Sequence, residues 1–337
     1  MKNIGYLSIV GLGLLSLLAS SCGEIKKGEY AKGAATIFCD DGFRNVLEEE
    51  IDVFEYTYKD SNIIPSYVSE AEAVDALMGD TTEAIIITHE LNKDQIKAIR
   101  DNYKKVVKQN CIAVDAVGLI VNKDNPLNDI SMEDIGKIMK GEITRWNQLA
   151  LADTADIQIV FDNQNSSTVR YMREKFLDGR LITDNPDIHV FAQQNNRQVF
   201  DAVRDNPHAI GIISVSWLGD SLENARKVPV KDRLDGYESD GVVARELTTE
   251  VKVLAVQNPT EENDYTLVAY KPYQAYIATG EYPLFRKVYM ITTASSSHLM
   301  KSFYDFMTGT VGQKIIANTG ILPYHLNPRV VELRQNK

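Results

Sequence analysis

The sequence repeats one local unit, a short apolar strand that runs into a polar turn and then into an amphipathic helix. Residues 36–39 predict a strand that is followed by a turn and a helix over 43–54. Residues 84–88 predict a continuous apolar strand, and further helices are predicted over 70–78 and 93–103. Strands that alternate with helices favour an α/β fold with a mostly parallel sheet and helices on both faces. In such sheets, ligands bind where the carboxyl ends of strands meet helix N-termini.

A later copy of this unit carries the most polar turn. Alternating apolar residues over 157–161 predict a strand, and apolar residues at helical spacing predict a helix from Val169 onward. The turn between them ends in three hydroxyl side chains, those of Ser166, Ser167 and Thr168. The first turn of a helix has backbone N–H groups without intrahelical partners and carries partial positive charge, so this turn is a candidate oxyanion site. The alternative is a well-capped helix that binds nothing.

The N-terminus predicts export. Residues 1–21 are predicted to be a signal peptide, because Lys2 precedes an apolar run over 4–19 that is short for a transmembrane span. The small residues before Cys22 resemble a bacterial lipobox, which implies cleavage before Cys22, lipidation of its thiol and a periplasmic or cell-surface protein anchored to a membrane. A plain secretory peptide is the alternative. The polar residues over 22–33 predict a tether.

Composition limits the partners of this chain. The 47 acidic and 36 basic side chains give a formal net charge of −11, which argues against nucleic acid, because phosphate backbones require clustered Lys and Arg. The length of 337 residues predicts two domains. No Cys or His spacing indicates a metal site, and we expect no metal and no cofactor. Cys39 and Cys111 lie in or beside apolar strand-like segments, so we expect buried free thiols, with a disulfide as the alternative.

Several motifs follow one another in a recognisable order. Residues 115–126 read Asp-Ala-Val-Gly-Leu-Ile-Val-Asn-Lys-Asp-Asn-Pro, and residues 131–146 contain Glu-Asp-Ile and Gly-Glu-Ile-Thr before a Trp. Residues 206–214 read Asn-Pro-His-Ala-Ile-Gly-Ile-Ile-Ser, and residues 282–286 read Tyr-Pro-Leu-Phe-Arg. Together with a C-terminal helix and tail, these motifs resemble the phosphate-binding proteins of bacterial ABC importers over roughly residues 34–325.

The resemblance implies a two-lobed periplasmic-binding-protein fold of the second type. Each lobe is then a mixed, mostly parallel sheet flanked by helices, and two crossover strands join the lobes, which close on a ligand between them. Transferred to this chain, one lobe takes residues 34–117 plus 289–337, and the other takes residues 118–288. The starts of several helices are expected to surround a gap that is lined by water and sized for a small solute.

In that family, helix N-termini from both lobes hold phosphate through backbone amides and hydroxyls, together with one Arg and one Asp. The resemblance therefore implies a ligand-binding set drawn from both lobes. The matching positions are Asp40, Asp41 and Gly42, then Thr88 and His89, then Asp162, and finally Ser166, Ser167 and Thr168.

Several of these positions depart from the family. Asp40 and Asp41 stand where the family has hydroxyls, His89 falls on the family's Asp, and Asp162 falls on the family's Arg. Phosphate beside these carboxylates would meet like-charge repulsion, on the order of a few kcal/mol for each close pair.

Three alternatives would relieve this repulsion. The aspartates cap helices and turn away from the ligand, or Arg44, Arg170 or Arg197 supplies the missing guanidinium from another direction. In the third alternative, the ligand is a cationic or hydroxyl-rich solute. His89 also introduces a group that titrates near neutral pH.

The predicted function is that of a non-enzymatic, monomeric receptor that presents phosphate or a related small oxyanion to an ABC permease. One alternative is a phosphate-ester hydrolase that uses Asp40, Asp41 or Asp162 with His89. The sequence lacks a nucleophile elbow, a metal-ligand cluster and a Cys–His pairing, which argues against this alternative. Another is a binding or sensing lipoprotein for a non-phosphate solute.

Overall fold

A mixed sheet of ten strands forms the centre of the molecule. The computed structural model describes residues 31–182, 188–219, 227–239, 246–258, 268–293 and 298–326. The strand order is β2-β1-β3-β12-β4-β8-β6-β7, and β9 and β13 also pair with β4. The strands are β1 (Gly33–Asp40), β2 (Ser61–Val68), β3 (Ala84–Ile87), β4 (Val107–Asn122), β6 (Gln158–Phe161), β7 (His189–Ala192), β8 (Ala209–Ser214), β9 (Val251–Val253), β12 (Phe285–Thr293) and β13 (Leu322–Pro323). A small separate sheet contains β5 (Asp129–Ser131), β10 (Ala255–Gln257) and β11 (Ala269–Tyr270).

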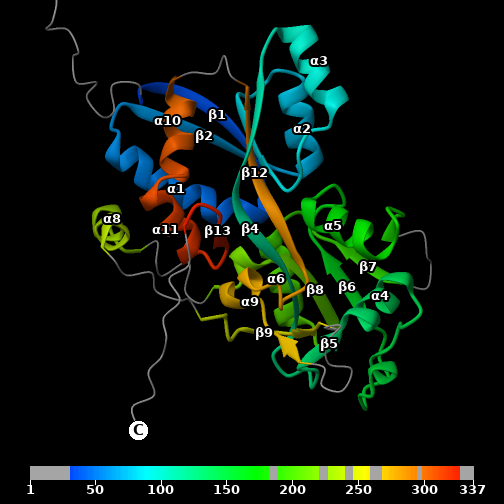
Figure 1. Ribbon diagram of the computed structural model, residues 1–337. Coiled ribbons are helices and arrows are strands. Elements are labelled where there is room, and N and C mark those ends of the chain that lie inside the picture. The colour runs from blue at the N-terminus through cyan, green and yellow to red at the C-terminus, as the bar shows by residue number, and fades with distance from the viewer. Residues whose placement is uncertain are drawn as a thin grey trace, which may run out of the picture.

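Helices flank both ends of the large sheet (Figure 1). Contacts place α2 on β1 and β3, and α6 on β4, β6 and β8. The helices are α1 (Arg44–Thr57), α2 (Glu70–Met78), α3 (Lys93–Tyr103), α4 (Met132–Lys140), α5 (Ser167–Phe176), α6 (Asn196–Asp205), α8 (Val230–Glu238), α9 (Gln274–Ala278), α10 (His298–Met307) and α11 (Thr310–Asn318). The α/β class predicted from the sequence is confirmed.

Local sequence explains where these helices begin. Ser69 accepts a hydrogen bond from the backbone N–H of Glu72, whose carboxylate accepts one from the Ser69 N–H, and this capping box starts α2. Asn92 and Gln95 form the same box at the start of α3. The bounds predicted for these two helices, 70–78 and 93–103, are confirmed.

Two long strands connect the two ends of the sheet. β4 is 16 residues long; it pairs with β12 over Val107–Ala116 and with β8 over Val117–Val121. The predicted lobe boundaries, 117/118 and 288/289, fall inside β4 and β12. We call the described residues up to 117 and from 289 lobe 1, and those between them lobe 2; this division stays a prediction.

The pairing pattern reflects this connection. β1 pairs in parallel with β2 and β3, and β6 pairs in parallel with β7 and β8. Every pairing of β4 and β12 is antiparallel, because the chain runs out of lobe 1 along β4 and returns along β12. Parallel pairing therefore joins β1, β2 and β3 in lobe 1 and β6, β7 and β8 in lobe 2, whereas each strand pair that includes β4 or β12 is antiparallel.

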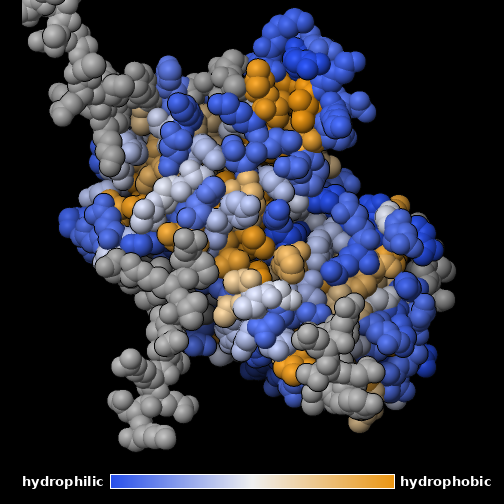
Figure 2. Space-filling model, viewed as in Figure 1, coloured by the Kyte–Doolittle hydropathy of each residue, from blue (hydrophilic) through white to orange (hydrophobic). Residues whose placement is uncertain are grey.

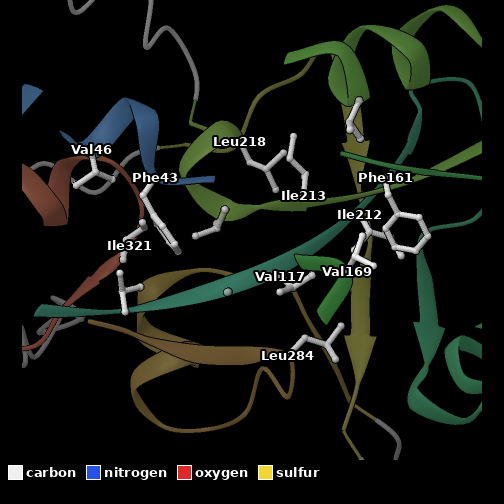
Figure 3. Close-up of a cluster of buried hydrophobic side chains, with 14 of the residues drawn as sticks. Phe43, Val46, Val117, Phe161, Val169, Ile212, Ile213, Leu218, Leu284 and Ile321 are labelled. Atoms are coloured by element: carbon white, nitrogen blue, oxygen red, sulfur yellow. The ribbon is translucent and has the colours of Figure 1, made fainter. Parts of the chain in front are cut away.

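One apolar cluster extends through both lobes. Figure 3 shows Val117 of β4 between Phe43, which lies just before α1, and Phe161 at the end of β6. All three side chains are buried, as is Trp146, which packs in the same cluster. A second cluster lies between β3 and helices α2 and α3. The lobes therefore meet over apolar contacts as well as polar ones.

One helix crosses from its own lobe to the other. α8 belongs to lobe 2 by sequence but packs against α1 and α11 of lobe 1. Arg233 of α8 forms an ion pair with Glu49 of α1, and its other amino group lies 3.1 Å from Asp52. α8 therefore adds a polar contact between the two lobes.

The surface in view is mainly hydrophilic, with an apolar patch beside α3 near the top (Figure 2). In the described part of the chain, no helix combines the length and the apolar character needed to cross a membrane. Cys39 is buried in β1, Cys111 is half-buried in β4, and both are free thiols. The predicted signal peptide, the lipidation site Cys22 and most of the predicted tether lie outside the described residues.

We predict that Gly312→Ala destabilises the fold, because α11 approaches the end of α10 closely at this position. A Cβ at residue 312 would lie 2.5 Å from the Met307 Cα and would also meet the Phe306 carbonyl oxygen. Backbone atoms cannot move aside cheaply, so we expect a loss of about 1–3 kcal/mol in the free energy of unfolding, measured by urea titration.

The matched control is Gly236→Ala in α8, where a Cβ would meet no atom within 4 Å. Ala stabilises a helix interior relative to Gly, so this variant should gain up to about 1 kcal/mol. Equal stabilities for the two variants would contradict the proposed close packing of α10 and α11.

Candidate functional site

The site is built around the N-terminus of α5, where the polar turn after β6 ends. Ser166 is the N-cap: its Oγ accepts a hydrogen bond from the Val169 N–H (3.2 Å) and donates one to Asp162 Oδ1 (2.5 Å). The next amide, that of Ser167, points out of the helix toward lobe 1 and has no partner inside the helix. A carboxylate from lobe 1 meets this amide.

That carboxylate is Asp40, the last residue of β1. Its Oδ2 accepts a hydrogen bond from the Ser167 N–H (3.0 Å), and its Oδ1 accepts from Ser167 Oγ (2.9 Å) and from the Gly42 N–H (3.0 Å). Asp40 and Ser167 are both 0% exposed. The predicted anion-binding N-terminus therefore does hold an anionic group, and that group belongs to the protein.

The neighbouring Asp41 repeats this arrangement at another helix. Its Oδ2 accepts hydrogen bonds from the backbone N–H (3.0 Å) and the Nδ2 (3.2 Å) of Asn196, the first residue of α6. Asn196 Nδ2 also donates to Asp162 Oδ2 (3.1 Å), whereas Asn196 Oδ1 is buried without a partner in the described structure. Asn196 thus links both acids at the lobe interface. It was not predicted from the sequence.

A fourth acid, Glu70 of α2, lies on the same interface and was also not predicted. It accepts hydrogen bonds from the backbone N–H (2.7 Å) and Oγ1 (2.8 Å) of Thr88, and it pairs with the Arg170 Nε of α5 (2.6 Å). Arg170 Nη2 donates in turn to Thr88 Oγ1 (2.8 Å). Figure 1 shows α2 and α5 facing each other across this interface. His89 Nδ1 lies 3.1 Å from the Glu70 carboxylate.

Arg286, at the start of β12, brings a guanidinium to the first turn of α5. Its Nη2 lies 3.4 Å from Thr168 Oγ1, and its Nε and Nη2 each lie 3.0 Å from Asp115 Oδ2. Its Nη1 is buried without a hydrogen-bond partner among the described residues. Arg286 therefore has a donor to spare beside Thr168.

The three arginines predicted as substitutes form ion pairs with acids of the protein. Arg44 pairs with Asp41, Arg170 pairs with Glu70, and Arg197 pairs with an acid of its own helix. Sequence reasoning missed Arg286 because it lies more than 100 residues from the turn that it approaches. Its only signal was its place at the end of the recognised 282–286 motif.

The buried acids of this cluster have opposite pKa shifts. Burial first, and the nearby Glu70 charge second, raise the pKa of Asp40 to about 6. Burial and the Asp40 charge raise the pKa of Asp162 to about 8. Burial would also raise the pKa of Glu70, but His89 and Arg170 outweigh burial and hold it well below its usual range.

All nine predicted site residues therefore lie at one interface between the lobes, but the expected water-lined gap is not what the structure shows there. Asp40, Ser167, Thr168 and Asn196 are each 0% exposed and are bonded to one another or to their neighbours. The carboxylates that replace the family's hydroxyls are long enough to reach the opposite lobe, and they occupy the space between the two lobes. Within the described residues, no group of three or more His, Cys, Asp or Glu side chains is arranged to hold a metal ion.

Comparison with known proteins agrees with this architecture. A family model described as a PBP superfamily domain matches residues 26–310. The chain belongs to the PBP superfamily. The predicted two-lobed fold of the second periplasmic-binding-protein type is confirmed by the structural matches below.

Among curated PBP-superfamily relatives, the phosphate-binding protein PstS of Borreliella burgdorferi is 23% identical over 287 residues, which is 82% of this chain and 85% of that protein. A Clostridium perfringens protein solved with bound phosphate superposes with a TM-score of 0.66 at 19% identity, over 86% of this chain and 99% of that one. An ABC-type phosphate transport receptor from Vibrio cholerae gives a TM-score of 0.58 at 18% identity, over 86% and 100% of the two chains. The predicted resemblance to phosphate-binding proteins is confirmed.

We predict that Asp162→Asn becomes more stable relative to the wild type as the pH rises. The folded protein keeps a proton on Asp162 up to about pH 8, whereas the unfolded chain releases it near pH 4, so folding costs more as the pH rises through this window. Asn bears no proton to lose, and we expect a relative gain of about 1–3 kcal/mol between pH 5 and pH 8, measured by urea unfolding.

Asp94→Asn in α3 is the control, because Asp94 is exposed and lies outside the interface. Its stability difference from the wild type should stay flat over the same pH range. A flat difference for Asp162→Asn as well would show that Asp162 is not held protonated by its surroundings.

Proposed function

We propose that the chain is a lipid-anchored, extracytoplasmic solute-binding protein of an ABC importer that binds phosphate or a related small oxyanion between its two lobes. Membership of the PBP superfamily and the relatives named for phosphate binding support this role. In the proposal, the protein is a non-enzymatic monomer that hands its ligand to a permease. The lipobox-like sequence before Cys22 supports the anchor.

The observation that carries the proposal is the group of hydrogen-bond donors that meets at the start of α5. The backbone N–H and Oγ of Ser167 already hold two anionic oxygens, those of Asp40. The hydroxyl of Thr168 and the unpartnered Nη1 of Arg286 belong to the same cluster. Amides, hydroxyls and a guanidinium that are removed from bulk water form strong, charge-assisted bonds to oxyanions.

The acids of the cluster favour an oxyanion that carries its own proton. The carboxylate of Glu70, whose pKa is held low by His89 and Arg170 against the effect of burial, is ionised near neutral pH, and an ionised carboxylate only accepts hydrogen bonds. A ligand with an O–H group can donate to such a carboxylate, whereas a fully ionised ligand would set its lone pairs against those of the carboxylate. Phosphate retains such a proton near neutral pH, so it fits this cluster better than sulfate does.

Binding would be coupled to closure of the lobes. Donors from α5 and from the 40–42 turn of lobe 1 reach the same point only when the lobes are together. A ligand that contacts both sets stabilises the closed form and shifts the equilibrium toward it.

Isothermal titration of the mature chain with phosphate tests the proposal, and we expect one site per chain. Thr168→Val should weaken phosphate binding about tenfold, because it removes one hydrogen bond to a charged ligand at nearly constant side-chain volume. Thr310→Val, at an exposed position in α11, is the control and should bind as the wild type does. Absence of heat with phosphate, sulfate, molybdate and phosphonates would exclude an oxyanion ligand.

The anchor has a separate test. Cys22→Ser removes the thiol that would carry the lipid, so we expect the protein to move from the membrane fraction to the soluble extracytoplasmic fraction. Phosphate binding should be unchanged, because Cys22 precedes the part of the chain that forms the site. Retention of Cys22→Ser in the membrane fraction would contradict lipid anchoring at this residue.

A further inference from the structure

Two consecutive acids of lobe 1 each bind the N-terminus of a different helix of lobe 2. Asp40 binds the first amide of α5, and Asp41 binds the first amide of α6. Both helices are 10 residues long, so each presents an appreciable partial positive charge at this end. The Asp40-Asp41 pair therefore lies where an oxyanion held by these helix N-termini would have to lie.

The remaining polar contacts at this interface are also made by the protein itself. Glu70, which is buried, and Arg170, which is half-buried, form an ion pair between α2 and α5, and Thr88 bonds to both of them. The backbone N–H of Ala71 donates to the Asn165 carbonyl at 3.4 Å. These contacts join the two lobes at this face through the protein's own side chains and backbone.

The cluster nevertheless has unused binding capacity. Arg286 is 6% exposed, lies beside Thr168 and has an unpartnered Nη1, and Asn196 is fully buried with an unpartnered Oδ1. A buried donor or acceptor without a partner destabilises the arrangement that contains it. A donor and an acceptor without partners indicate that the self-bonded arrangement is not the best-bonded state of these residues.

The charges around Asp40 make it displaceable. The charges of Glu70 and Arg286 act on its carboxylate in opposite directions, and Arg286 is shared with Asp115. Burial and Glu70 act against its ionised form, while three hydrogen bonds hold it. An oxyanion that took over these bonds could also use the free Arg286 donor.

We propose that Asp40 is a built-in competitor for the ligand site: it holds the lobes closed through the N-terminus of α5, and an oxyanion binds by displacing its carboxylate. This inference rests on the proposed function, because it assumes an oxyanion ligand. It adds that the protein without ligand is in a closed form. The apparent affinity for the oxyanion is then proportional to the fraction of molecules in which Asp40 does not occupy the site.

The test compares wild type with Asp40→Ser and Asp40→Asn. Ser can still cap the Gly42 amide but is too short to reach Ser167, and Asn keeps the shape of Asp while losing its charge. Asp94→Asn supplies a matched loss of one charge at an exposed position outside the interface. Each chain is titrated calorimetrically with inorganic phosphate, and its shape is measured by small-angle X-ray scattering with and without phosphate.

We expect both Asp40 variants to bind phosphate at least about tenfold more tightly than wild type. This factor corresponds to a wild type in which Asp40 occupies the site in about nine molecules of ten. The affinity of Asp94→Asn should lie within about twofold of wild type. Without phosphate, wild type should scatter as the closed form, and Asp40→Ser should show a larger radius of gyration that falls when phosphate is added.

Different failures have different meanings. Equal or weaker phosphate binding by both Asp40 variants, with binding by wild type, overturns this inference and leaves the proposed function standing. An expanded wild type without phosphate also overturns it. Absence of phosphate binding in every chain overturns the proposed function, and the scattering of phosphate-free Asp40→Ser then shows separately whether Asp40 closes the lobes.

Discussion

The interaction on which the site depends is the bond between a buried carboxylate and the open end of a helix. Asp40 ends β1 and Ser167 begins α5, so one hydrogen-bonded pair joins the carboxyl end of a strand in one lobe to the first helix after a strand in the other. An ionised group is costly to bury alone, and helix amides are costly to leave without partners. The buried Asp40 carboxylate and the first amide of α5 therefore stabilise each other.

The same constraint explains the surrounding acids. Asp41 accepts a hydrogen bond from the first amide of α6. Asp162 accepts hydrogen bonds from Ser166 and Asn196, and Glu70 accepts them from Arg170 and Thr88. His89 and Arg170 outweigh burial and lower the pKa of Glu70, whereas burial and the Asp40 charge raise the pKa of Asp162. The interface thus combines a permanently charged pair with acids that titrate nearer to neutral pH.

Local elements of this fold were predictable because their causes are local. The capping boxes at Ser69 and Asn92 set the starts of α2 and α3, and the continuous apolar run over 84–87 is β3, which is buried along its whole length. The hydroxyl turn before α5 was recognised by its residue types and by its place between a strand and a helix. All of these signals lie within about ten residues of the structure that they specify.

The sequence by itself determined the α/β class, the start of α5 as a helix N-terminus with spare amides, and the resemblance that indicated two lobes. Only the tertiary structure decided which groups meet that N-terminus: Asp40 from 127 positions away, and Arg286 from 118 positions beyond Thr168. The reason is physical. Helix caps and strand patterns depend on neighbours along the chain, whereas the partner of a buried charge depends on which strand ends the crossing of β4 and β12 brings together.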